Sequence, residues 1–131
     1  MQSVDELADE ITTLASHISA ATARWLDLLV EFDARCGWST SGAKSLAHWV
    51  SYMCSMSPAA AREHVRVARR LRELPQTAAA FARGELSYSK VRAITRVEEL
   101  ERESELLPLA RAASASQLER IVRGYRSCLA V

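Results

Sequence analysis

Apolar residues recur along the whole chain at intervals of three and four, and this spacing predicts helices throughout. The longest pattern covers residues 3–35, where Ser3 and Glu6 form a capping box at its start and Cys36-Gly37 ends it. Its apolar positions alternate steps of four and three without a break. We call them the heptad seam: Leu7, Ile11, Leu14, Ile18, Ala21, Trp25, Leu28 and Phe32.

The heptad seam needs a partner, and the pattern leaves two alternatives open. Another helix of the same chain can cover it, as in four-helix bundles, or the same helix of a second chain can. Trp25 and Phe32 are large enough to anchor an interface, so we predict a homodimer through the first helix. Its predicted contact residues are Leu7, Ile11, Leu14, Ile18, Trp25, Leu28 and Phe32.

The remaining helices are marked by caps and breakers. A short helix is predicted over 45–54, and Ser57-Pro58 begins another that runs to Leu74. Further helices are predicted over 76–83, ended by Gly84, and over 88–97. A helix over 98–113 contains Pro108, which predicts a kink or a break, and Ser114 caps the last helix, which carries Leu118, Ile121, Val122, Tyr125 and Leu129.

These elements predict a single all-α domain over 1–131, with six or seven helices and no sheet. It divides into a long helix (3–35), a helix-turn-helix core (45–97) and C-terminal helices (98–131). The predicted core residues are Trp25, Leu46, Trp49, Val65, Ala68, Leu71, Leu74, Phe81, Leu86 and Val91.

Charge is distributed unevenly although the net charge is only +1. Residues 1–35 carry seven acids and two arginines, whereas residues 58–96 carry nine basic residues and three acids. Residues 97–113 are again acidic. A basic centre between acidic flanks predicts one basic face on a nearly neutral protein.

Two consecutive helices joined by a short turn, the second beginning at Ser57-Pro58, are typical of a helix-turn-helix. Small residues at Ser51 and Ala61 suit a close crossing of the two helices, although glycine would suit the turn better than Ser55. On the second helix, Arg62, Arg66 and Arg69 are spaced by four and three residues, opposite the apolar stripe, and Arg70 lies beside them.

Because Arg62, Arg66 and Arg69 lie opposite the apolar stripe, we predict that the core does not need them. An arginine stripe on such a helix suits the major groove of DNA. The predicted DNA-binding residues are Ser57, Arg62, Arg66, Arg69, Arg70, Lys90, Arg92 and Arg96. The alternative is a solvated basic face that only keeps the domain soluble.

Other chemistry is disfavoured. The three cysteines, Cys36, Cys54 and Cys128, are odd in number and widely spaced, which is typical of cytoplasmic thiols. These cysteines and the three histidines lack the spacing of zinc ligands. The chain has no phosphate-binding glycine loop and no recognisable nucleophile with its base, so we expect no enzyme, cofactor, small-molecule ligand or membrane span.

The segment from Leu74-Pro75 through Gly84-Glu-Leu-Ser87 to Ile94 resembles the core of ParB-type DNA-binding proteins in its architecture. A more specific resemblance covers nearly the whole chain. It rests on Gly42-Ala-Lys-Ser-Leu-Ala-His-Trp49, Ser57-Pro-Ala-Ala-Ala-Arg62, Gly84-Glu-Leu-Ser-Tyr-Ser-Lys-Val-Arg92 and Gln117-Leu-Glu-Arg120. These motifs resemble the actinobacterial domain of unknown function 222, the amino-terminal part of the 13E12 repeat family.

That resemblance implies a domain found ahead of an HNH nuclease domain in mobile-element and phage-related proteins. This chain contains no HNH metal-ligand cluster of its own. The expected function is therefore a DNA-binding helix-turn-helix domain for double-stranded DNA, the targeting module of such a nuclease. The alternative is a protein-interaction or homodimerisation module without direct DNA binding.

Overall fold

The computed structural model describes the backbone of residues 1–129 and the side chains of residues 1–126. Helices are the only regular secondary structure in this part of the chain, with no strand, which confirms the predicted all-α fold with its long first helix. The helices are α1 (Val4–Ala34), η1 (Ser39–Ser41), α2 (Leu46–Met53), α3 (Pro58–Leu71), α4 (Pro75–Ala82), α5 (Tyr88–Ile94), η2 (Leu100–Arg102), α6 (Glu103–Ala112) and α7 (Ala115–Leu129). The side chains of Cys128 and Leu129 lie outside the described residues.

Serine caps explain where five of these helices begin. The hydroxyls of Ser3, Ser45, Ser57 and Ser87 each accept a hydrogen bond from the backbone N–H three residues later, at 3.1–3.2 Å. Ser114 makes the complete capping box with Gln117, because each residue's side chain accepts from the other's backbone N–H. The predicted starts of these five helices are therefore confirmed.

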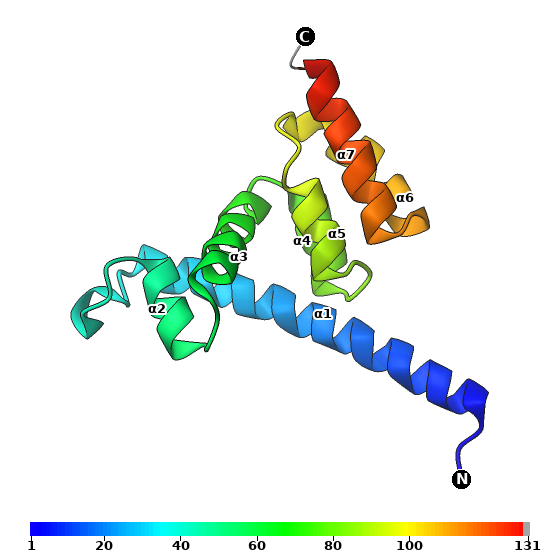
Figure 1. Cartoon of the computed structure of the whole chain (residues 1–131), viewed down its shortest axis with the longest axis horizontal. Coiled ribbons are helices and arrows are strands. Elements are labelled where there is room, and N and C mark those ends of the chain that lie inside the picture. Colours follow the sequence, from blue (N-terminus) through cyan, green and yellow to red (C-terminus); the bar gives the residue numbers. More distant parts are fainter. Residues whose placement is uncertain (130–131) are drawn as a thin grey trace.

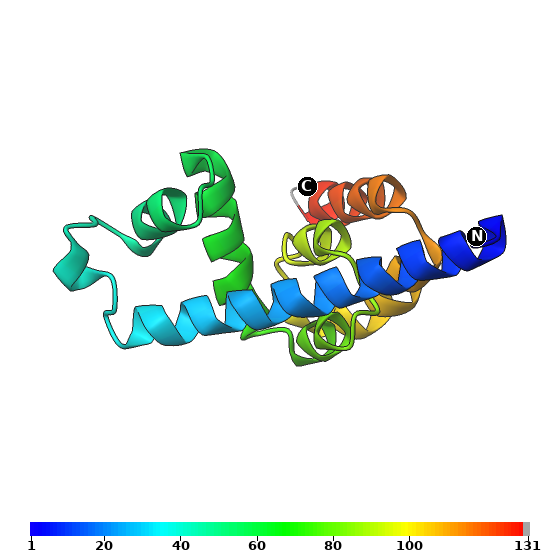
Figure 2. The same cartoon turned by 90° about the horizontal axis from the view of Figure 1, so that it is seen from below.

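Helix α1 runs along one edge of the molecule, and its first turns extend beyond the other helices (Figure 1). Seen from below, α1 lies in front of the remaining helices along most of its length (Figure 2). Helices α3 and α4 pack on α1, α2 packs on α3, and α7 packs on α5.

The core forms where these helices meet. Leu26 and Leu29 of α1 are buried there together with Phe81 of α4 and Val91 of α5. Eight of the ten predicted core residues are buried, and Trp25 and Trp49 are partly buried against the same core.

The predicted bounds of three helices differ from the structure. Helix α3 stops at Leu71 and α5 at Ile94, three residues before the predicted ends, and both continue as turns. The helix predicted over 98–113 begins only at Glu103, after the short η2 helix. Of the kink or break predicted at Pro108, the break does not occur, because α6 continues through that residue. The φ angle of proline fits a helix, and the packed helix tolerates the loss of one backbone hydrogen bond at Pro108, because proline has no N–H to donate.

The same chain covers the heptad seam unevenly. Trp25 packs on His64, and Phe32 packs on Trp49, so the end of the seam is partly covered by the same chain. The seam residues before Trp25 remain exposed. None of the helices within residues 1–129 is both long enough and apolar enough to cross a membrane.

Candidate nucleic-acid interface

Helices α2 and α3 are joined by a tight turn that Ser51 closes. Its hydroxyl donates to the carbonyl of Met56 at 2.7 Å, and its carbonyl accepts from the N–H of Met56 at 3.1 Å. Ser55 has a φ of 56°, in the left-handed region where glycine is preferred. Ala61 is fully buried, as a close approach of two helices requires.

Helix α3 has one face in the core and one in solvent. Val65, Ala68 and Leu71 are buried, and they alternate with arginines as predicted. Arg62 is exposed and makes no ion pair with any residue whose side chain is described. It is therefore available to a partner.

Arg66 and Arg70 are less exposed than Arg62, because both bond to the segment that follows α5. Arg66 donates to the hydroxyl of Thr95 at 3.1 Å, and that hydroxyl belongs to a buried residue just after α5. Arg70 donates to the carbonyls of Val97 and Glu98 at 2.6 and 3.1 Å. These two arginines therefore hold α3 to residues 95–98.

The side chain of Arg69 points toward α1, and not toward the segment after α5 that Arg66 and Arg70 contact. Its guanidinium lies 3.0 Å from a carboxylate oxygen of Asp33 and stays more than half exposed. A hydrogen bond from Trp38 holds the pKa of Asp33 below its ordinary value; burial opposes this, and Arg69 adds to the lowering. Arg69 is thus already paired, although solvent still reaches it.

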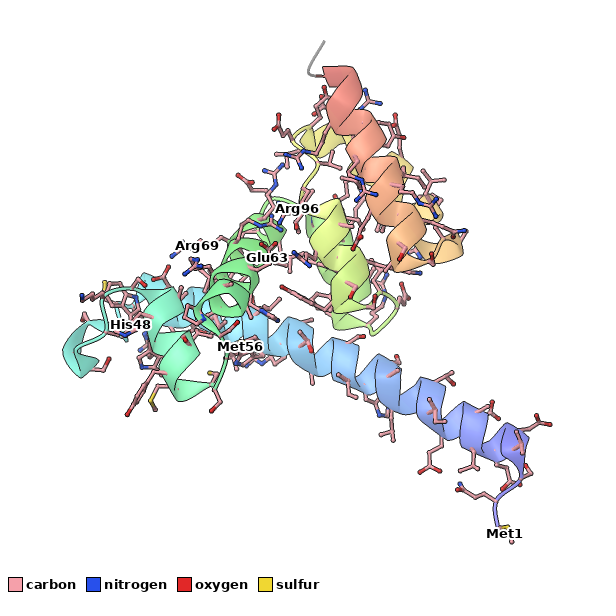
Figure 3. All side chains as sticks on the ribbon, viewed as in Figure 1. Met1, His48, Met56, Glu63, Arg69 and Arg96 are labelled. Carbon is pink, nitrogen blue, oxygen red and sulfur yellow. The ribbon has the colours of Figure 1, made fainter. Side chains whose placement is uncertain are left out.

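Glu63 of α3 gathers three arginines from two parts of the chain. Arg66 forms an ion pair with it, Arg92 Nε lies 3.3 Å from Oε1, and a terminal nitrogen of Arg96 lies 3.1 Å from each carboxylate oxygen. Figure 3 shows Arg96 and Glu63 together where the end of α5 meets α3. Burial would raise the pKa of Glu63, but the hydrogen bonds and charges of the arginines outweigh burial and lower it.

A groove of about 300 Å³ between α5 and α7 continues this cluster. Arg92 and Arg96 line one side of it, and Glu119, Arg123 and Arg126 of α7 line the other. The sequence analysis missed Arg123 and Arg126. Their spacing of three residues on the last helix was the available signal, but only the packing of α7 on α5 brings them beside Arg92.

We call the resulting surface the basic face. It joins α3, α5 and α7, and eight arginines share it with three acids. Its residues are Arg62, Arg66, Arg69, Arg70, Arg92, Arg96, Arg123 and Arg126, with Glu63, Glu73 and Glu119.

The other predicted residues have more local roles. Ser57 caps α3, and the backbone of Lys90 is capped by Ser87 while its side chain is half-buried on α5. Among the described side chains, no three His, Cys, Asp or Glu residues come together as a metal site. The basic face is therefore the best-supported site in the described part of the chain.

Comparison with curated proteins and with solved structures gave no match. A comparison with models of protein families gave one match, to the family described as a domain of unknown function (DUF222), and it covers residues 4–130. The resemblance found in the sequence motifs is thereby confirmed. The chain belongs to the DUF222 family.

Proposed function

We propose that this chain is a DNA-binding module that holds double-stranded DNA against the basic face. In this proposal α2 and α3 act as a helix-turn-helix, and the first half of α3 enters the major groove. The observation that carries the proposal is the basic face itself, where three helices bring eight arginines together with three carboxylates. Such a surface attracts a phosphate backbone.

The arginines divide into two groups by their contacts. Arg62 is unpaired, exposed and near the start of α3, so it is the best candidate to reach a base edge. Arg92, Arg96, Arg123 and Arg126 flank the α5–α7 groove and suit phosphates. Arg66 and Arg70 support the interface by holding α3 to the end of α5.

The wider role that we propose comes from the family resemblance in the sequence motifs. The domain would target a nuclease of the HNH type, carried by a mobile element or phage, to DNA. Such a role puts the protein in the cytoplasm.

Fluorescence anisotropy with a labelled DNA duplex, at about 50 and about 200 mM salt, tests the proposal because each phosphate contact steepens the salt dependence of binding. The key variant is Arg62→Ala with Arg123→Ala, since neither side chain has an ion-pair partner among the described residues. Arg83→Ala is the matched control: Arg83 is exposed, lies outside the basic face and is paired with Glu85.

We expect the double variant to keep its melting temperature, to bind DNA about tenfold or more weakly, and to show a log–log salt slope shallower by one to about two. The control should bind like the parent. A parent chain that binds no duplex at either salt concentration would overturn the proposal and favour a protein-interaction module. A double variant that binds like the parent would show that the basic face is not the DNA-binding surface.

A further inference from the structure

Helix α1 has two apolar faces, and its own chain covers only one of them. Ala23, Leu26 and Val30 pack into the core, and Ser16 contacts Gly84 on the same side. In the heptad pattern these residues face away from the seam. Before Trp25, the rest of the chain therefore packs on α1 on the side away from the heptad seam, and from Trp25 onward it also covers part of the seam.

The seam itself is open over its first half. Ile11, Leu14 and Ile18 keep 66, 52 and 65% of their surface exposed. Val4 and Leu7 extend the exposed row toward the start of α1, where the helix projects beyond the rest of the molecule (Figures 1 and 2). A row of large apolar side chains on a projecting helix is typical of an interaction surface.

We propose that a second copy of this chain covers the seam, with the two α1 helices antiparallel and their midpoint at Ser16. This register pairs Leu14 with Ile18 and Ile11 with Ala21 of the second copy. It also brings Val4 and Leu7 of one copy to Leu28 and Trp25 of the other. Every seam position from Val4 to Leu28 then faces an apolar position, and each contact occurs twice.

The charges along α1 favour the antiparallel direction. Four acids lie between residues 5 and 10, so a parallel pair would bring eight carboxylates together at one end. The antiparallel register separates the two acidic segments and brings Glu10 to Arg24 of the second copy. In the single chain Arg24 has only a loose pairing with Asp27, at 3.6 Å with both side chains exposed, so it is free to turn to Glu10.

A groove at the other end of the seam provides a place for the start of the second copy. It has a volume of about 570 Å³, and its apolar walls include Trp25, Leu28, Phe32 and Trp49. Val4 and Leu7 of the second copy reach this groove in the proposed register. This explains how Trp25 and Phe32 can pack within their own chain and still leave a surface that a partner fills.

The first test is the mass of the intact protein in solution, by light scattering coupled to gel filtration over a range of concentrations. We expect twice the chain mass of 14.5 kDa. Ile11→Asp with Ile18→Asp should raise the dissociation constant about thirtyfold or more. Thr12→Asp with Thr13→Asp is the matched control, because it adds the same charge on exposed positions outside the seam.

All four substituted residues are exposed, so circular dichroism of each variant should show an unchanged helical content. A parent that remains monomeric at every concentration overturns the proposal. A dimer that tolerates the two seam aspartates as well as the control pair shows that another surface is used, and it overturns the proposal too.

The second test concerns the direction of the helices. Glu10→Arg alone and Arg24→Glu alone should each weaken the dimer, and the two changes in one chain should restore it, because the pair then meets with reversed signs. In a parallel dimer these residues are far apart, so the combined variant would gain nothing. Failure of this rescue overturns the proposed register. DNA binding is measured separately and is not needed for either outcome.

Discussion

The hydroxyl of Ser16 in α1 donates a hydrogen bond of 2.9 Å to the carbonyl of Gly84, which lies 68 residues later. Gly84 follows the end of α4 and has a φ of 75°, and a Cβ added to it would lie 2.5 Å from the carbonyl oxygen of Ser16. Gly84 therefore lies close to both the side chain and the backbone of Ser16, and only glycine fits there.

We predict that Gly84→Ala lowers the free energy of unfolding by about 2–4 kcal/mol, from the left-handed backbone and from the overlap with α1. Gly124→Ala is the control, because Gly124 lies within α7 and an added Cβ there has no neighbour within 4 Å. That variant should be more stable than the parent by about 0.5–1 kcal/mol. Urea denaturation measures both, and equal stability of Gly84→Ala and the parent would contradict the close approach.

At Ser55 we predict a substitution that raises the stability of the protein. It occupies the left-handed region at the turn between α2 and α3, and its side chain makes no hydrogen bond in the described structure. Ser55→Gly should stabilise the protein by about 0.5–1 kcal/mol, because glycine adopts this conformation without strain. The same change at exposed Ser89 within α5 should destabilise it, and a lower melting temperature for Ser55→Gly would argue against the strained turn.

Much of the fold could be predicted from local signals. Ser57-Pro58 and the Ser114–Gln117 capping box mark helix starts without reference to the rest of the chain, and the apolar period identifies the buried side of α3. On α1 the same period identifies the heptad seam, most of which is exposed. Helix α6 does not break at Pro108, because tertiary packing can stabilise a helix that the local sequence disfavours.

The candidate site was less predictable, because a stripe of like residues on one helix does not reveal their partners. Arg62 and Arg66 look equivalent in sequence, yet only Arg66 meets Thr95, which is 29 residues away. Arg123 joins the surface through the packing of α7 on α5, which no local pattern indicates.

Glu103 illustrates a long-range contact with a measurable consequence. Its carboxylate is almost completely buried and accepts a hydrogen bond of 2.7 Å from the backbone N–H of Thr77, in the first turn of α4. It therefore caps a helix whose own cap residue, Leu74, has no side chain able to do so.

We predict that Glu103→Ala lowers the free energy of unfolding by about 2–4 kcal/mol, because it removes a charged cap and leaves a buried N–H without an acceptor. Glu101→Ala, at an exposed position two residues earlier, should change stability by less than about 0.5 kcal/mol. Chemical denaturation of the two variants under the same conditions separates the effect of the cap from the loss of one acidic charge. Equal effects would contradict the capping role.

The last prediction concerns Glu63, whose carboxylate bonds to Arg66, Arg92 and Arg96. Because the arginines hold its pKa below the ordinary value of 4.5, the unfolded chain binds a proton at this group more readily than the folded chain does. Its contribution to stability is therefore present above about pH 4.5 and is lost as the pH falls through the lowered pKa. Glu63→Gln should lower stability by about 1–3 kcal/mol at pH 7.

The same variant should lose less stability than the parent when the pH is lowered below 4.5, since the titrating group is gone. Glu105→Gln is the control, because Glu105 is more than half exposed and pairs only with Arg102. Denaturation between pH 3 and pH 7 measures both the stability loss at pH 7 and the weaker pH dependence, because this range extends about one and a half units below and two and a half above the ordinary pKa.

Glu63→Gln also frees three arginines of the basic face from their carboxylate. If that face binds DNA as proposed, the variant should bind duplex at least as tightly as the parent despite its lower stability, because the lost carboxylate repels phosphate. A less stable variant that also binds more weakly, while its helical content is unchanged, would mean that Glu63 orders a surface that DNA requires. An unchanged pH profile would contradict the lowered pKa itself.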